Sequence, residues 1–338
     1  MGFMYENGYY LPENKHLAKQ YYQMAADQGF ARAQSDLGYM YSTGDTVPKN
    51  YVEAIKYYQM SADQGYAEAQ STLGYFYETG KGVDKDYDKA FYYFKLAADQ
   101  HHVAAQCNLA WMYYHGYGTE VNQELAVKYY QLAADKGLAR AQCNLGYCYQ
   151  EGFGVKKDQD MAIKYYTLGA IGKSPIASYN LAQIYYHGNG VTVSYTTALD
   201  YFKLAADKRH SNSVYQLSKI YLEGVGKGEG AVKPDFELAI KYLVLGEKIW
   251  NQDCRRVLSD VFSSQRAPAA TYLQKQWPEV HWFLEEECKF LIMEVIFLFT
   301  QLDLIPKELI LEIARAIVLV WPSHYPPQRL EREKRNNV

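Results

Sequence analysis

Apolar residues recur along this chain with a long, regular period. Leucine stands at a constant interval of 36 residues, at Leu37, Leu73, Leu109, Leu145, Leu181 and Leu217. Each leucine is followed four residues later by a tyrosine and seven residues later by a glycine. Residues four apart lie on one side of an α-helix, so each Leu–Tyr pair predicts a helical face that turns toward a core. The glycine ends the helix, because glycine adopts the left-handed conformation after a helix without steric cost.

A second amphipathic helix is predicted after each of these glycines. It contains an alanine and, three or four residues later, an aromatic pair: Tyr57-Tyr58, Tyr93-Phe94, Tyr129-Tyr130, Tyr165-Tyr166 and Tyr201-Phe202. Most of these helices close with two small residues, such as Ala97-Ala98, which let neighbouring helices approach closely. Each period is therefore one helical hairpin, and a series of such hairpins predicts an α-solenoid.

The repeated positions resemble the Sel-one-like repeat family, a relative of the tetratricopeptide repeat. The clearest stretch is AEAQSTLGYFYETGKGVDKDYDKAFYYFKLAADQ, which starts at Ala67. The resemblance extends from residue 1 to about residue 262. It implies an all-α fold, a right-handed superhelix of about six to seven 36-residue repeats with a C-terminal helical extension. It also implies an adaptor role.

The pattern divides the chain into three parts. We expect the repeat array at residues 1–265, a helical cap at 266–328 and a disordered tail at 329–338. Met1-Gly2 stands in the place of Leu-Gly, so we expect the first repeat to be truncated and its open end to allow a homodimer. Cys254 and Leu258 fit a degenerate seventh hairpin, which follows a sixth turn that is five residues longer than the others.

Charge and composition argue against several classes of function. The 35 Lys and Arg against 38 Asp and Glu create no global positive field that would gather nucleic acid. The N-terminus carries no basic stretch followed by an apolar one, as a secretory signal would, and the apolar runs after Ala267 are too short and too charged to cross a bilayer. The five cysteines lack metal-ligand spacing, so we expect free thiols in a reducing compartment and assign the chain to the cytoplasm.

No residue pattern in the chain supports catalysis, a metal or a cofactor. Gly-x-Gly recurs at 80–82, 116–118, 152–154 and 188–190, but each follows a predicted helix, and neither a Walker loop nor a dinucleotide fingerprint is completed. We interpret these segments as hairpin turns. His115 and His187 lie two repeats apart, too far to share a metal in a solenoid whose units contact only their neighbours.

The candidate binding residues lie on the outward side of the first helices. If leucine and tyrosine face inward, the positions two before, one before, two after and five after each leucine face outward. In tetratricopeptide relatives this side is the concave groove. The predicted site residues are Tyr39, Tyr75, Asn108, Trp111, Tyr114, Asn144, Tyr147, Asn180 and Tyr186.

These residue types suit an extended peptide. Asparagine offers both a donor and an acceptor, as a peptide backbone does, and aromatic rings grip side chains by burial and stacking. The resemblance implies that asparagine at this place can clamp ligand backbones or carboxyl ends. Arg32 and Arg140 stand isolated in the sequence, so we expect a neutral internal segment rather than a free carboxylate. In the alternative interpretation, asparagine before Leu-Gly is ordinary in the family and the aromatic residues pack against the next repeat.

Two functions therefore remain open. The first is a non-catalytic scaffold that binds a protein or peptide along the groove. The second is a substrate receptor of a ubiquitin ligase, because LIPKELILEIARAIV, within residues 300–321, faintly resembles the start of an F-box. An enzyme that handles β-lactams, by analogy with distant secreted relatives, lacks residues to carry it.

Overall fold

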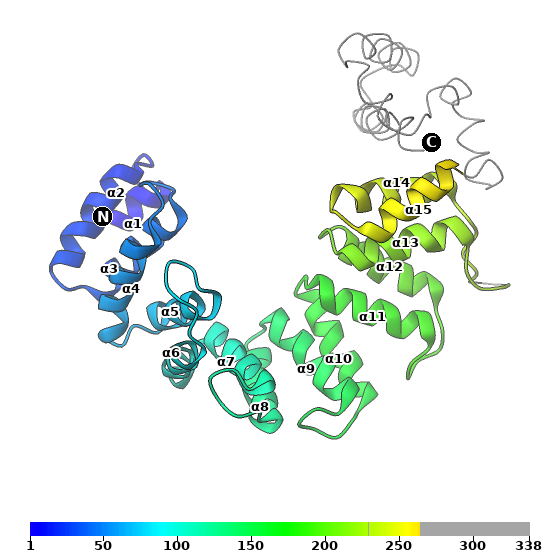
Figure 1. Ribbon diagram of the computed structural model, residues 1–338, viewed down its shortest axis with the longest axis horizontal. Coiled ribbons are helices and arrows are strands. Elements are labelled where there is room, and N and C mark those ends of the chain that lie inside the picture. Colours follow the sequence, from blue (N-terminus) through cyan, green and yellow to red (C-terminus); the bar gives the residue numbers. More distant parts are fainter. Residues whose placement is uncertain (229, 264–338) are drawn as a thin grey trace, which may run out of the picture. The chain divides into compact units, whose positions relative to one another are not determined.

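The computed structural model describes residues 1–228 and 230–263 (Figure 1). This part of the chain forms fifteen helices and no strand apart from one isolated bridge between Val225 and Val232. The first helices of the hairpins are α1 (Gly2–Asn7), α3 (Ala31–Thr43), α5 (Ala67–Thr79), α7 (Val103–His115), α9 (Ala139–Glu151), α11 (Pro175–His187), α13 (Ser211–Glu223) and α15 (Gln252–Ser263). The second helices are α2 (Lys15–Asp27), α4 (Tyr51–Asp63), α6 (Tyr87–Asp99), α8 (Gln123–Asp135), α10 (Gln159–Ile171), α12 (Tyr195–Ala206) and α14 (Phe236–Lys248). The all-α fold and the hairpin repeat predicted from the 36-residue period are confirmed.

Specific residues begin and end these helices. Five first helices end at a glycine in the left-handed conformation, with φ between 72° and 81° at Gly44, Gly80, Gly116, Gly152 and Gly188. The second helices begin at a side-chain N-cap; Asp86, for example, accepts a hydrogen bond from the backbone N–H of Lys89 at 3.0 Å. Equivalent caps are Asn14, Asn50, Asn122, Asp158, Ser194 and Asp235. Each repeat therefore sets its own helix boundaries.

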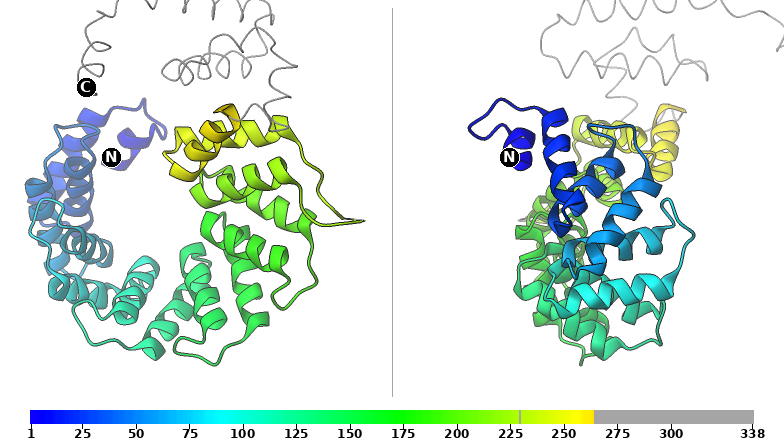
Figure 2. Two further views of the ribbon diagram at one scale, coloured as in Figure 1. Left: turned by 45° about the vertical axis from the view of Figure 1, so that its right-hand side comes forward. Right: turned by 90° about the vertical axis from the view of Figure 1, so that its left-hand side faces the viewer.

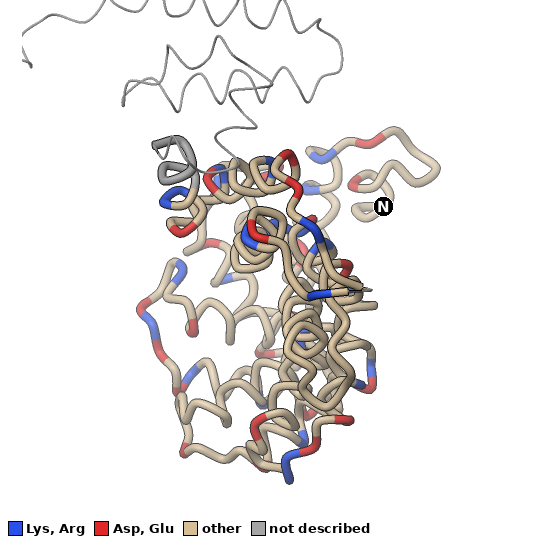
Figure 3. Tube along the Cα trace, turned by 90° about the vertical axis from the view of Figure 1, so that its right-hand side faces the viewer, with Lys and Arg blue, Asp and Glu red and all other residues tan. Residues whose placement is uncertain are grey.

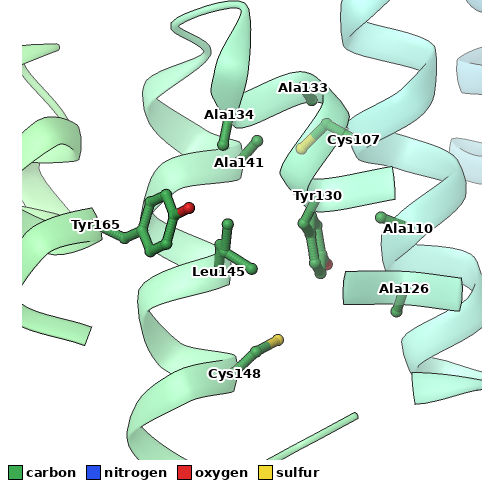
Figure 4. Packing of buried hydrophobic residues seen from close by; sticks show 10 residues of the cluster. All are labelled: Cys107, Ala110, Ala126, Tyr130, Ala133, Ala134, Ala141, Leu145, Cys148 and Tyr165. Carbon is green, nitrogen blue, oxygen red and sulfur yellow. The ribbon is translucent and has the colours of Figure 1, made fainter. Parts of the chain in front are cut away.

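A buried leucine of the first helix organises the core of each hairpin, and in α3, α5 and α9 a glycine follows it. The leucines are fully buried, and an aromatic ring of the second helix rests on the glycine. A Cβ on Gly74 would lie 2.7 Å from the ring of Phe94, and one on Gly146 would lie 2.9 Å from the ring of Tyr166. Figure 4 shows the next layer, in which Tyr130 of α8 lies between Ala110 of α7 and Leu145 of α9. The second helices α4, α6, α8 and α10 thus pack against two first helices, their own and the next.

Tyrosines also tie several repeats to the one before. Tyr77 of α5 stacks on Tyr93 of α6, with ring centroids 5.8 Å apart, and the hydroxyl of Tyr93 donates to Gln59 of α4 at 2.9 Å. Gln59 in turn donates to Asp63 at 2.6 Å. The same chain of contacts runs from Tyr165 to Gln131 and Asp135. These tyrosines therefore serve packing within and between repeats. Figure 2 shows the succession of hairpins that they join.

The Gly-x-Gly segments are turns, as predicted. The second glycine of each lies against the first turn of the second helix in the preceding repeat. A Cβ on Gly118 would lie 2.2 Å from the carbonyl oxygen of Tyr87, and one on Gly154 would lie 2.2 Å from that of Gln123. Only glycine permits this approach of two backbones, so the motif reflects packing rather than phosphate binding.

The described residues fall into two compact units. The first comprises residues 1–220 and 224–233, and the described part of the second comprises 221–223 and 234–263. In the second unit α14 packs against α15, and Cys254 is fully buried at the place predicted for the alanine of a seventh hairpin. The predicted cap at 266–328, the tail at 329–338 and the F-box-like segment within 300–321 lie outside the described residues.

Candidate peptide-binding surface

Nine predicted residues share one side of the first helices in the first unit. We call this set the first-helix face: Tyr39, Tyr75, Asn108, Trp111, Tyr114, Asn144, Tyr147, Asn180 and Tyr186. Tyr39 is 56% exposed, and Tyr75 and Tyr147 are each 41% exposed. The other six are half-buried. All of them stand at three equivalent positions of α3, α5, α7, α9 and α11, so neighbouring repeats present the same kind of side chain to solvent.

One predicted outward position is wrong. The residue two before the leucine is buried in four repeats, at Ser35, Ser71, Cys107 and Cys143. Cys107 belongs to the core cluster that contains Tyr130 and Ala133 of α8, because its small side chain lies where the second helix covers the first. Burial raises the pKa of the Cys107 thiol, which disfavours the thiolate that a nucleophile requires. This position contributes to packing and not to a binding surface.

An aromatic cluster surrounds Trp111, and the sequence interpretation included only part of it. The ring centroid of Trp111 lies 4.7 Å from that of His115 and 4.9 Å from that of Tyr117. Tyr117 stacks on Tyr87 of the preceding repeat at 4.4 Å. Burial lowers the pKa of His115, which favours its neutral form. The sequence could have revealed Tyr117, because it is the middle residue of a Gly-x-Gly turn. Two other repeats have a polar residue there, lysine or asparagine, so an aromatic residue at this position stands out.

A second aromatic contact joins two repeats of the face. Phe153, the middle residue of the next Gly-x-Gly turn, lies 5.7 Å from both Tyr114 of α7 and Tyr147 of α9. The middle repeats therefore form the most aromatic part of the first-helix face. Offset and tilted rings of this kind offer large apolar surfaces with little conformational freedom to lose on binding.

Two asparagines of the face lie beside buried tyrosine hydroxyls. Burial raises the pKa of Tyr130, and the amide of Asn144 partly offsets the rise. Burial likewise raises the pKa of Tyr166, with Asn180 beside it, although the Tyr166 hydroxyl has no hydrogen-bond partner among the described residues. These asparagines thus stand at the boundary between the core and the face. The packing interpretation therefore accounts for part of their role.

The third asparagine has a charged partner that the sequence did not reveal. Nη2 of Arg140, at the start of α9, donates a hydrogen bond to Oδ1 of Asn108 in α7. The sequence interpretation did not anticipate this contact between Arg140 and the predicted asparagine row. The two residues are 32 positions apart, and only the length of the arginine side chain across neighbouring first helices brings them together.

Asp36 occupies the asparagine position in the first of these repeats. Burial raises the pKa of its carboxyl to about 6, Arg32 opposes the rise, and Glu6 adds to it. The pKa of this carboxyl is higher in the folded state than in the unfolded state. The folded protein therefore loses stability as the pH rises from the unfolded-state pKa to the folded-state pKa.

We therefore expect Asp36→Asn to be more stable than the wild type at pH 7 and equally stable near pH 4. Because Asp36 is partly exposed, solvent screening reduces the expected gain to about 1 kcal/mol. Thermal unfolding of both proteins at the two pH values measures the difference. An equal or lower melting temperature for the variant at pH 7 would contradict the burial of a charged carboxylate.

The described surface carries charges of both signs. Figure 3 shows lysine and arginine interspersed with aspartate and glutamate, between long stretches that carry neither. Within residues 1–228 and 230–263, no three His, Cys, Asp or Glu side chains gather closely enough to hold a metal ion. No helix in this part of the chain is both long and apolar enough to cross a membrane.

The succession of helical hairpins defines a helical-repeat protein. Comparison with known proteins gives its family. The Sel1 repeat model matches seven consecutive segments, at residues 1–30, 31–66, 67–102, 103–138, 139–172, 175–210 and 211–245. The chain belongs to the Sel1 repeat family. Sel1 repeats generally serve as non-catalytic scaffolds that mediate protein interactions.

Solved structures of the same repeat resemble the chain. One is c5321, described as a protective antigen present in uropathogenic Escherichia coli strains, with 27% sequence identity and a TM-score of 0.64. That match covers 81% of this chain but only 59% of the E. coli chain. Another is a Sel1 repeat protein from Oxalobacter formigenes, with 33% identity, a TM-score of 0.57 and coverage of 60% of this chain and 82% of the other. The comparison with curated proteins found no match.

Proposed function

We propose that this chain is a non-catalytic scaffold that binds an extended protein segment along the first-helix face. The observation that carries the proposal is a row of aromatic side chains at one repeat position, of which Tyr39, Tyr75 and Tyr147 are exposed and Trp111 is half-buried. Aromatic residues are enriched at binding hot spots, because they offer large contact areas at a low entropic cost. The alternative role in a ubiquitin ligase depends on residues outside the described part, so we place the scaffold first.

Two features support recognition of an extended segment. The face repeats along the array, so it offers the same contact to successive parts of one ligand chain. Asparagine at the equivalent positions 108, 144 and 180 supplies polar groups beside the aromatic row. The free thiols of the described cysteines, at Cys107, Cys143, Cys148 and Cys254, fit a reducing compartment such as the cytoplasm.

Site-specific photo-crosslinking tests where the partner lies. We expect the photoreactive residue benzoylphenylalanine in place of Tyr147 to crosslink a bound protein in cell extract. The matched control carries it in place of Tyr92, which is 57% exposed but lies on the second helix α6. Crosslinks from position 147 alone support the first-helix face, whereas crosslinks from position 92 alone would place binding on the second helices.

A further inference from the structure

The guanidinium of Arg140 extends across the first-helix face without a carboxylate partner. Its side chain is exposed, and it forms no ion pair with any carboxylate in the described part of the chain. It donates a hydrogen bond to Oδ1 of Asn108, a neutral acceptor, and also lies within hydrogen-bonding reach of the neutral Cys107 thiol. A guanidinium carries five N–H donors, and neither of these neutral partners balances its positive charge.

The same hydrogen bond orients the amide of Asn108. With Oδ1 held by Arg140, the Nδ2 amino group of Asn108 points away from that bond, and it donates no hydrogen bond to another described residue. Arg140 and Asn108 therefore present a charged donor next to a neutral donor. Such a pair matches an anion with two acceptor oxygens, since guanidinium pairs with carboxylate in a bidentate geometry.

One acidic group near Arg140, Glu78, does not pair with it. Glu78 of α5 lies close enough for Arg140 and Lys85 to lower its pKa, but burial has the larger effect and raises that pKa. Glu78 forms no ion pair with Arg140. The same positive charge also acts on the Cys107 thiol, where it opposes the rise in pKa caused by burial.

This arrangement occurs at one point of the array. The positions equivalent to Arg140 hold Arg32, Glu68, Ala104, Ile176 and Asn212. Arg32 is the only other cation among them, and its guanidinium lies 5.9 Å from the ring centroid of Phe3 instead of on an asparagine. A repetitive face alone allows a ligand to bind in several registers, whereas a single anion site within it selects one.

We propose that Arg140 and Asn108 form a carboxylate-binding site within the first-helix face. The ligand carboxylate is either an Asp or Glu side chain of the bound segment or its C-terminal carboxylate. This inference rests on the proposed peptide-binding function and replaces the expectation of a neutral segment. Trp111 lies one turn after Asn108 in α7 and Tyr147 two turns after Arg140 in α9, so the aromatic row continues directly from the anion site.

The test uses the full chain and peptides that it selects from a random dodecamer library. Each selected peptide is synthesised in three forms: unchanged, with Asp and Glu replaced by Asn and Gln, and with its C-terminal carboxylate amidated. We expect one of the two neutral forms to bind between about ten- and a hundredfold more weakly, as for the loss of a hydrogen bond between charged groups. The affected form identifies the source of the carboxylate.

Variants then locate the site. In Arg140→Gln we expect the charged and neutral forms to bind equally, while Arg140→Lys keeps part of the difference because it keeps the charge without the planar fork. Arg32→Gln, at the equivalent position of another repeat, should leave the difference unchanged. Circular dichroism of each variant checks that the helices are intact.

Three outcomes would overturn the inference in distinguishable ways. Peptides that depend on Trp111 but bind equally in all three forms would remove the carboxylate site and leave the proposed function. A carboxylate preference that survives in Arg140→Gln would place the site elsewhere. A library that yields no peptide weakened by Trp111→Ala would overturn the proposed function itself, and the carboxylate site with it.

Discussion

Replacing Gly118 by alanine is expected to destabilise the repeat array by about 3 kcal/mol or more. The backbone at Gly118 has a φ of +64°, where an L-residue with a Cβ costs roughly 1–2 kcal/mol. The new Cβ would also lie 2.2 Å from the carbonyl oxygen of Tyr87 and 3.0 Å from Cβ of Phe91. These are backbone and Cβ atoms of α6, which cannot move aside alone, so relieving the overlap requires separation of two repeats. Overpacking of this kind adds roughly 1–3 kcal/mol.

Gly137 provides the matched control for this substitution. Its φ is +83°, but a Cβ there would meet nothing within 4 Å. We therefore expect Gly137→Ala to cost only the conformational term, about 1 kcal/mol. Urea unfolding followed by circular dichroism compares the two variants with the wild type. Equal losses in both would mean that the turn at Gly118 does not pack closely against the preceding repeat.

Truncating Trp111 to alanine is expected to weaken partner binding about 30-fold, which corresponds to about 2 kcal/mol. Trp111 stands in the middle of the aromatic row and is half-buried against His115 and Tyr117, so its ring is already fixed before a ligand arrives. A pre-ordered ring loses little conformational entropy on binding, and its removal also takes away the support of Tyr117. Titration of a purified partner or a selected peptide measures the change.

Tyr92→Ala is the control for the loss of an exposed aromatic ring. Tyr92 lies on α6 and is 57% exposed, so its truncation removes a comparable surface from the second helices. We expect this variant to bind as the wild type does. If Tyr92→Ala lost affinity and Trp111→Ala retained it, the working surface would be on the second helices.

Sequence periodicity predicted the helical hairpins because every repeat contains the residues that begin, end and bury its own helices. A buried leucine, a glycine that ends the first helix and a polar residue that caps the second recur every 36 residues, and all of these signals act over a few positions. The Gly-x-Gly turns were predicted for the same reason. The approach of their second glycine to the preceding repeat needed the structure, because it joins residues more than 30 positions apart.

The candidate face was predicted less completely. The 100° step of a helix identifies the side opposite the leucine, but it does not show how far the neighbouring helix covers each flank. The position two before the leucine fell on the covered flank, which is why Ser71 and Cys107 are buried. The contact between Arg140 and Asn108 was missed because it depends on the reach of one long side chain between repeats.

The most direct test of the binding face is affinity capture from cell extract. The bait is the wild-type chain, the double variant Trp111→Ala/Tyr147→Ala or the control Tyr92→Ala, and the captured proteins are identified by mass spectrometry. We predict that the wild type and Tyr92→Ala retain the same set of proteins and that the double variant loses one or more of them while its helicity stays intact. An unchanged set on the double variant would contradict binding through the first-helix face.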